Sequence, residues 1–301
     1  MKQIPYPRGA IVALLALLLA ACEKPYVGLQ EEEAAPAVNF FVNVTSFEQI
    51  PFDDAVTRAS APSEVCSRLN FVIYQGDEKV KSIPQRVTDA DFGRIAIALP
   101  QGQYKLAVVG HSSVASASIS SLDKISFEKS LITDTFSFYD EFEIGEGTQT
   151  LDITLRRVVA MFRLQQTADV PEGVTQLKFY YTGGSSTLSA VTGYGSVNSK
   201  QTVVLDVAPQ QREFEVYTIP HAETGELKMT ISALNAAGAT VYERTFENVP
   251  VQRNRVTRYV GDIFDGTTPD VPDTPDTPET FEVSSQLQVL AEWDEEHIVT
   301  F

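Results

Sequence analysis

The stretch TLDITLRRVVAMFRLQQ, residues 150–166, contains two strand-like runs in direct succession. In TLDITLRR, apolar and polar residues alternate, which is typical of a β-strand with one buried face. VVAMFRLQQ follows at once and opens a second series of strands. We interpret this point as the junction of two β-sandwich units, an N-terminal one over residues 37–157 and a C-terminal one over residues 158–264.

Short alternating runs separated by turn residues continue on both sides of this junction, and almost no helical period is present. In the first unit, a strand is predicted at 37–47 and another at 68–75, with a turn at Gly76. Residues 94–110 predict a hairpin with Pro100 and Gly102 at its bend. In the second unit, strands are predicted at 176–181, 202–207, 212–219, 226–234, 240–249 and 255–264, with a turn from Asn235 to Gly238. The predicted fold is therefore all-β, with two sandwiches of about 100 residues each in tandem.

The first 21 residues have the composition of a secretory signal peptide. Lys2 and Arg8 precede an apolar run that is too short to span a membrane and that ends at Cys22. Its end, LAAC, resembles the bacterial lipobox, in which the cysteine thiol accepts a lipid. Cys22 is the predicted lipidation site, and residues 22–36 the predicted tether; an ordinary signal peptide that is cut elsewhere is the alternative. Several acyl chains on one cysteine make a firm membrane anchor.

Charge and cysteine content exclude several classes of function. The 301-residue chain has a formal net charge of −17, and removal of residues 1–21 takes away two positive charges and leaves −19. Such a chain repels phosphate groups, so nucleic-acid binding is not expected. After Cys22 one cysteine remains, Cys66, which lies in a predicted strand and is expected to be a buried, inert thiol.

No arrangement of residues predicts catalysis or a cofactor. His111, His221 and His297 lie far apart, in no metal-ligand spacing. A Gly-x-Ser-x-Gly motif is absent, and DADFG, residues 89–93, lacks the later ligands of a calcium loop. We therefore expect neither an enzyme nor a metal or cofactor site.

The glycine- and serine-rich stretch YYTGGSSTLSAVTGYGSVNSK, residues 180–200, has two interpretations. A P-loop is excluded because no lysine follows Gly183 and Gly184. The stretch is either a long connection over a sheet or a sugar-binding loop. In the second interpretation the rings of Tyr180, Tyr181 and Tyr194 would stack on a pyranose.

The chain ends in a spacer and an additional amphipathic segment. Prolines recur at every third residue of the predicted linker 265–280, the period of a polyproline II helix. In the tail, 281–301, one parity carries an apolar row: Phe281, Val283, Leu287, Val289 and Trp293. We expect this row to be a strand that the protein donates to a neighbour. The alternative is that the tail folds back as an edge strand, or covers one of the protein's own sandwiches.

Several stretches resemble the FimB-type fimbrial anchor and accessory lipoproteins of Bacteroidetes, which belong to type V pili. In the first unit they are CSRLNFVIYQGDEKVK, FGRIAIALPQGQYKLAVVGHSS, DTFSFYDEFEIG and LDITLRRVVAMFRL. In the second unit they are KFYYTGGSST, TGYGSVNSKQ, EVYTIPH and VPVQRNRVTRYVGDIF. The resemblance covers about residues 65 to 264. It implies transthyretin-like β-sandwiches, a lipid anchor in the outer membrane, exposure at the cell surface and assembly with other fimbrial subunits.

The resemblance also gives Arg58 a deciding role. Pilins of this type lose their lipidated first strand to an arginine-specific protease, and the open groove then accepts a strand from another subunit. Anchor subunits keep both the strand and the lipid. Arg58, in a polar loop after the first strand, is the candidate cleavage site. The resemblance therefore implies a fimbrial anchor or accessory subunit that supports adhesion. The alternatives are a pilin matured at Arg58 and a surface lipoprotein that binds glycans through the Gly/Ser/Tyr loop and Trp293, with host or bacterial surface molecules as partners.

Overall fold

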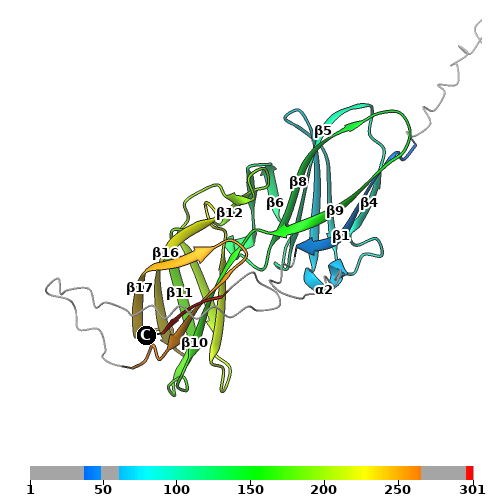
Figure 1. The fold of residues 1–301 in the computed structure, drawn as a ribbon. Helices are drawn as coiled ribbons and strands as arrows, with labels where there is room; N and C mark the ends of the chain where they lie inside the picture. The colour runs from blue at the N-terminus through cyan, green and yellow to red at the C-terminus, as the bar shows by residue number, and fades with distance from the viewer. Residues whose placement is uncertain (1–36, 49–60, 266–295, 301) are drawn as a thin grey trace, which may run out of the picture. The chain divides into compact units, whose positions relative to one another are not determined.

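The computed structural model describes residues 37–48, 61–265 and 296–300, and these residues are almost entirely β-strand (Figure 1). Helical turns in this part of the chain are limited to α2, Pro62–Val65, and the 3₁₀ turn Glu128–Ser130. The predicted all-β class, with sandwiches in both halves of the chain, is confirmed.

Nine strands belong to the first half of the described chain. They are β1 (Phe40–Glu48), β2 (Arg68–Gln75), β3 (Glu78–Arg86), β4 (Arg94–Ile97), β5 (Gly102–His111), β6 (Ser118–Ser121), β7 (Lys124–Ser126), β8 (Phe136–Ile144) and β9 (Gln149–Arg157). Seven of them form one sheet in the order β3-β2-β5-β8-β9-β1-β4. Buried residues from both arms, β3-β2-β5-β8 and β9-β1-β4, share one hydrophobic cluster, here called the first core. The sheet therefore folds over on itself as a sandwich.

Strands β2 and β5 are apolar on both faces, which explains their nearly continuous runs of hydrophobic residues. In β5, Leu106 and Val108 pack in the first core, whereas Ala107 and Val109 pack in another cluster. In β2, Phe71 faces the first core and its neighbour in the sequence faces the other cluster. Because successive side chains point to opposite faces of a strand, both faces of these strands are covered by protein.

The predicted hairpin at residues 94–110 is wrong. Strand β4 pairs with β1, and β5 pairs with β2 and β8, so the two strands belong to different arms of the sandwich. Their connection crosses the core instead of turning back on itself. Leu99 is buried in it, and the Asn39 side chain binds both the N–H and the C=O of Leu99, at 2.9 and 2.8 Å. Pro and Gly mark a change of chain direction, but they do not specify which strand pairs next.

Ten strands follow in the second half. They are β10 (Ala160–Gln166), β11 (Val174–Thr182), β12 (Thr187–Ser189), β13 (Tyr194–Gly195), β14 (Gln201–Asp206), β15 (Glu213–Thr218), β16 (Thr224–Asn235), β17 (Thr240–Gln252), β18 (Val256–Gly261) and β19 (Glu296–Thr300). Two four-stranded sheets, β15-β10-β18-β19 and β14-β11-β16-β17, enclose the second core. The predicted turn after Asn235 is present: its Oδ1 accepts hydrogen bonds from the N–H groups of Ala237 and Ala239, and Gly238 has a φ of +76°.

A third hydrophobic cluster joins the two halves. The small sheet β13-β12-β7-β6 takes two strands from each half, and residues of β2, β5, β7, β12 and β18 meet in the cluster. Val158 and Val159 lie in the link between β9 and β10 and are buried there, although the sequence pattern predicts them at the start of a strand. The junction of the two sandwiches is thus itself a hydrophobic core.

Candidate functional site

Strand β1 lies inside its sheet, not at the edge (Figure 1). It pairs in antiparallel fashion with β4, from Phe40 opposite Ile97 to Asn43 opposite Arg94. On its other side it runs parallel to β9 over its whole length. We call the space between β4 and β9 that this strand occupies the β1 slot. Without β1, the strand β4 would lose its pairing partner in the sheet.

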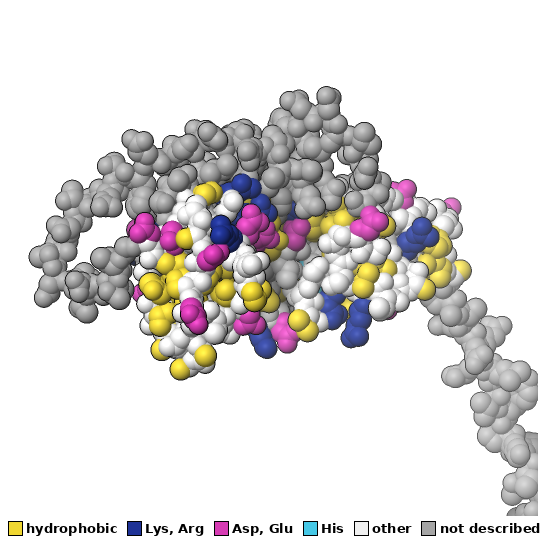
Figure 2. Space-filling view, turned by 90° about the horizontal axis from the view of Figure 1, so that it is seen from below, with side chains coloured by type: hydrophobic (Ala, Val, Ile, Leu, Met, Phe, Trp, Pro, Cys, Tyr) yellow, Lys and Arg dark blue, Asp and Glu magenta, His cyan; other side chains and the backbone are white. Residues whose placement is uncertain are grey.

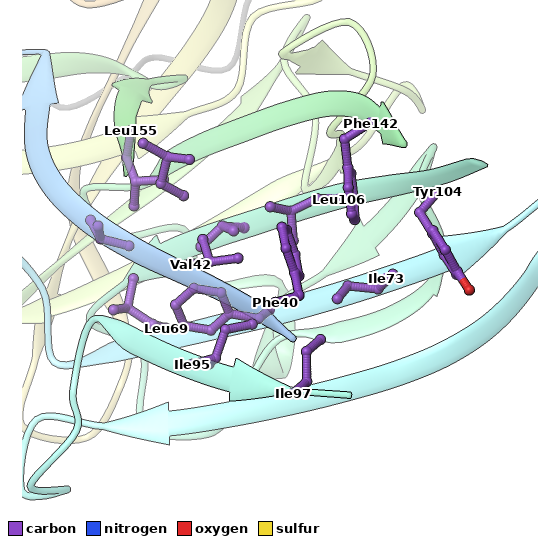
Figure 3. Packing of buried hydrophobic residues seen from close by; sticks show 14 of the residues in the cluster. Phe40, Val42, Leu69, Ile73, Ile95, Ile97, Tyr104, Leu106, Phe142 and Leu155 are labelled. Carbon is purple, nitrogen blue, oxygen red and sulfur yellow. The ribbon is translucent and has the colours of Figure 1, made fainter. Parts of the chain in front are cut away.

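Apolar side chains fill the slot from within. Four residues of β1 are buried in the first core: Phe40, Val42, Val44 and Phe47. Figure 3 shows Phe40 and Val42 among side chains of β2, β4, β5 and β8. Phe40 stacks on Phe142, with ring centroids 4.6 Å apart, and Phe47 meets Phe136 edge to face at 5.0 Å. Burial of each such side chain contributes about 1.5–3 kcal/mol, so the filled slot is strongly favoured over an empty one.

A β-bulge explains why this strand buries residues of two parities. The pairing with β9 shifts between Val44 and Ser46, which adds one residue to β1 and turns Phe47 inward. On the outer face, Asn43 Nδ2 donates to Asp152 Oδ1 at 2.8 Å, and Ser46 Oγ lies 2.7 Å from Thr154 Oγ1. The sequence predicted the strand, but its partners in β4 and β9 lie between 51 and 109 positions away, and no local signal identified the slot.

Most of the site residues predicted from the sequence lie outside the described residues. This holds for the lipidation site Cys22, for the cleavage site Arg58, and for the apolar row Phe281, Val283, Leu287, Val289 and Trp293. Residues 49–60, which contain Arg58, connect β1 to α2. The candidate cleavage site and the slot therefore adjoin each other along the chain.

The last described strand returns to the protein's own C-terminal sheet. Strand β19 runs parallel to β18, with Val256 opposite Glu296 and Val260 opposite Thr300 (Figure 1). It forms the edge of the sheet β15-β10-β18-β19. The alternative in which the tail folds back as an edge strand therefore describes residues 296–300, which follow the apolar row.

The three tyrosines of the Gly/Ser/Tyr loop do not form a common stacking surface. Tyr181 is fully buried in the second core, where its hydroxyl donates to Tyr217 O at 2.7 Å. Its neighbour Tyr180 is 37% exposed. Tyr194 donates its hydroxyl to Glu223 Oε2 at 2.8 Å, and the Arg253 guanidinium lies over its ring at 5.3 Å. The alternative interpretation, in which Tyr181 stacks on a sugar ring, is wrong, because this ring has no face open to solvent.

The glycines of this loop serve close packing. A Cβ atom on Gly184 would overlap the Thr218 side chain, and one on Gly195 would overlap Ser185. Ser185 is itself buried, and its Oγ donates to Thr187 O at 2.7 Å. Of the two interpretations of the loop, the packed connection accounts for these residues.

Among the described residues, the histidines and the cysteine belong to no group that could hold a metal. His111 is buried beside Asn70, whose Nδ2 lies 3.0 Å from His111 Nε2, and burial together with nearby Arg68 lowers the pKa of His111 to about 4. Burial raises the pKa of the Cys66 thiol to about 12, which agrees with an inert thiol. His221 is exposed and its Nδ1 lies 3.0 Å from Gly195 O, whereas His297 belongs to β19.

The remaining surface carries mixed charges. On the face shown in Figure 2, acidic and basic side chains lie among hydrophobic ones. Within residues 37–48, 61–265 and 296–300, no group of three or more His, Cys, Asp and Glu side chains is arranged to hold a metal. In the same part of the chain, no helix is long and apolar enough to cross a membrane.

Comparisons with known proteins give one family and several solved structures. The model of the family described as "Family of unknown function (DUF6562)" matches residues 31–297. No curated protein matches the chain.

Three of the similar structures come from Bacteroidetes. A candidate adhesin of Bacteroides ovatus is 16% identical, with a TM-score of 0.46 over 80% of this chain and 95% of that one. The fimbrial anchor protein Mfa2 of Porphyromonas gingivalis is 11% identical, with a TM-score of 0.38 over 68% of this chain and 81% of that one. A fimbrial assembly protein of Parabacteroides distasonis is 12% identical, with a TM-score of 0.37 over 75% of this chain and 90% of that one.

Proposed function

The chain belongs to the DUF6562 family, and we propose that it is an anchor or accessory subunit of a surface fimbria. In this proposal, lipid on Cys22 holds the protein in the outer membrane, and β-strand addition joins it to other fimbrial subunits. Its role is structural and adhesive, without catalysis.

One observation carries the proposal: the strand that completes the first sandwich is the first described strand of the chain. It begins at Phe40, soon after the predicted tether that ends at residue 36, and it lies between β4 and β9. A subunit that keeps β1 has its slot filled and is tethered by the same segment. Such a subunit cannot accept a strand in this slot, but it remains able to donate one.

The slot has the properties that strand addition requires. Backbone groups of β4 and β9 pair with both sides of β1, which provides affinity for any extended segment. Pockets for Phe40, Val42 and Val44 select alternating apolar side chains. The tail carries a similar alternation, Phe281, Val283, Leu287 and Val289, which supports its role as a donor to an equivalent slot in a neighbouring subunit.

Cleavage at Arg58 separates an anchor from a pilin. If residues 49–60 stay intact, β1 is part of the same covalent chain as α2 and the sandwich. A cut there leaves β1 held by non-covalent contacts alone, so that a donor strand can replace it. The anchor proposal therefore requires an uncut Arg58, whereas a matured pilin requires a cut one.

Mass spectrometry of the mature protein from outer-membrane fractions tests the proposal. We expect an N-terminal peptide that begins at an acylated Cys22, and an intact mass that includes β1. The Cys22→Ser variant should leave the outer-membrane fraction. A mature N-terminus at Ala59 would show a pilin instead, and a protein that is intact and lipidated but never co-purifies with fimbriae would favour a free-standing surface lipoprotein.

A further inference from the structure

A polar cavity of about 610 Å³ lies on the outer side of β8 and β9, away from the first core. Side chains of both strands line it, together with the connection 190–193 and Arg253 from the turn between β17 and β18. This volume is in the range of pockets that hold small molecules. The β1 slot, in contrast, is formed by side chains that point into the core.

The cavity exists because two neighbouring strands part. Strands β8 and β9 pair at Phe136 with Arg157 and at Ser137 with Arg156. Beyond this point β8 continues along β5 as far as Ile144, and β9 continues along β1. The opening between them is fixed by two well-paired strands, so the walls of the cavity are rigid.

One wall carries a buried hydroxyl group without a partner. Ser137 is 5% exposed, and its Oγ makes no hydrogen bond within the described residues. Buried hydroxyl groups nearly always find a hydrogen-bond partner, because an unpaired one costs free energy. Because Ser137 lines the cavity, a molecule in the cavity can supply the missing bond.

The opposite wall presents a fixed positive charge. Arg253 Nε donates to Glu223 Oε2 at 3.2 Å, and the guanidinium lies over the ring of Tyr194. Within the described residues, the hydrogen bond of this side chain uses Nε, which leaves both terminal nitrogens for a ligand. Arg156 adds a second guanidinium to the lining. In a chain with a net charge of −17, a cavity lined by two arginines and one carboxylate, that of Asp152, favours an anion.

The other polar groups favour hydroxyl groups on the same ligand. Asp152 already accepts from Asn43 Nδ2 and has further lone pairs to accept from a ligand O–H. Thr154 lies beside it on β9 and also lines the cavity. Tyr139 contributes an aromatic ring to the wall, and its hydroxyl donates to Glu141 Oε1 at 2.7 Å. An acidic sugar matches both kinds of group, because it offers a carboxylate to the terminal nitrogens of Arg253 and hydroxyl groups to Asp152 and Thr154.

We infer that this cavity binds an acidic monosaccharide unit of the uronate class. Its carboxylate pairs with Arg253, in the bidentate manner that guanidinium groups allow. Its hydroxyl groups bond to Ser137, Thr154 and Asp152. The inference does not depend on the fimbrial role, since the cavity belongs to the folded body of the protein.

Isothermal titration calorimetry of the full chain tests this inference, with D-glucuronate and D-galacturonate as probes and D-glucose and D-galactose as neutral counterparts. We expect saturable binding of at least one uronate, at least tenfold tighter than that of its neutral counterpart. Arg253→Gln and Ser137→Ala should each weaken binding tenfold or more. Arg212→Gln, which removes an exposed arginine paired with Asp169, is the matched control and should bind as the original protein does.

Ser137→Ala also guards against misfolding, because it removes an unpaired hydroxyl group and should leave the melting temperature unchanged. The inference is overturned by any of four results: no saturable binding of either uronate, equal affinity for the neutral sugars, full affinity in both cavity variants, or equally tight binding of inorganic phosphate.

Discussion

Asp134 and Arg157 form a two-pronged ion pair at the junction of the two sandwiches. Arg157 Nε lies 2.8 Å from Asp134 Oδ1, and Nη2 lies 2.9 Å from Oδ2. The third nitrogen, Nη1, donates to Asn254 Oδ1 in the second half at 3.0 Å, and the guanidinium lies over the ring of Phe136. With 2% of its side chain exposed, Arg157 connects both halves from within.

Replacement of Asp134 by alanine should destabilise the whole protein. The change leaves a buried guanidinium without its carboxylate, which costs about 3 kcal/mol in the free energy of unfolding. Equilibrium unfolding in urea measures this loss. Asp169→Ala removes the partner of Arg212 in an exposed pair and should cost less than about 1 kcal/mol. Equal losses in the two variants would show that the buried pair adds nothing beyond a surface pair.

Replacement of Phe40 by alanine should open a cavity in the β1 slot. Phe40 is fully buried and stacks on Phe142, so we expect a loss of about 3–5 kcal/mol in the free energy of unfolding. Val38→Ala, at a side chain that is 48% exposed, is the control and should change it by less than about 0.5 kcal/mol. A Phe40→Ala variant with unchanged stability would mean that β1 contributes little to the folded state.

Stability should fall as the pH falls from 7 to 5, because His111 is buried in its neutral form. Its pKa in the folded protein is about 4, below the ordinary value of 6.5, owing to burial and to Arg68. Over this interval the unfolded chain takes up a proton that the folded protein does not. The free energy of unfolding is therefore highest above pH 6.5 and should be lower by about 2 kcal/mol at pH 5.

Urea titrations at several pH values measure this slope. His111→Gln should reduce it, whereas His221→Gln, at an exposed position, should keep it. An unchanged slope in His111→Gln would assign the pH dependence to other groups.

Charges on the apolar row of the tail should block donation without unfolding the protein. Leu287→Asp with Val289→Asp places two carboxylates on the apolar parity, whereas Gln286→Asp with Gln288→Asp adds the same charge to the polar parity. We expect the first pair to abolish co-purification with fimbriae and the second pair to preserve it. Both variants should retain the melting temperature of the original protein. A large loss of stability in the first pair alone would show that the row packs on the protein's own fold.

The strands could be predicted from the sequence because their signal is local. Strand β2 was predicted at its observed limits, and the turn after Asn235 at its observed place. The pairing of β4 could not be predicted, since Pro100 and Gly102 are equally compatible with a hairpin and with a crossing between layers. Neighbours such as Asn43 and Asp152 are 109 positions apart in the chain, and no pattern in a single strand encodes such a partner.

The candidate sites show the same limit. Tyr180 and Tyr181 look equivalent in the sequence, but the alternation of a strand exposes one and buries the other. The cavity near β8 and β9 exists because the pairing of these two strands ends early. The point at which it ends depends on the twist and curvature of the assembled sheet. Ser137 and Arg253 are 116 positions apart and belong to separate halves. They line the same cavity only after the chain has folded.

The parallel pairing of β1 with β9 also sets the order in which the protein can fold. A ribosome completes β1 at residue 48, but its last partner strand ends at residue 157, so β1 is made early and its pairing is completed late. This topology has a high contact order, and such topologies fold slowly. Until β9 is made, the apolar side chains of β1, beginning with Phe40, are exposed and able to aggregate. A nascent chain of this kind benefits from a chaperone that shields one short apolar segment near its N-terminus.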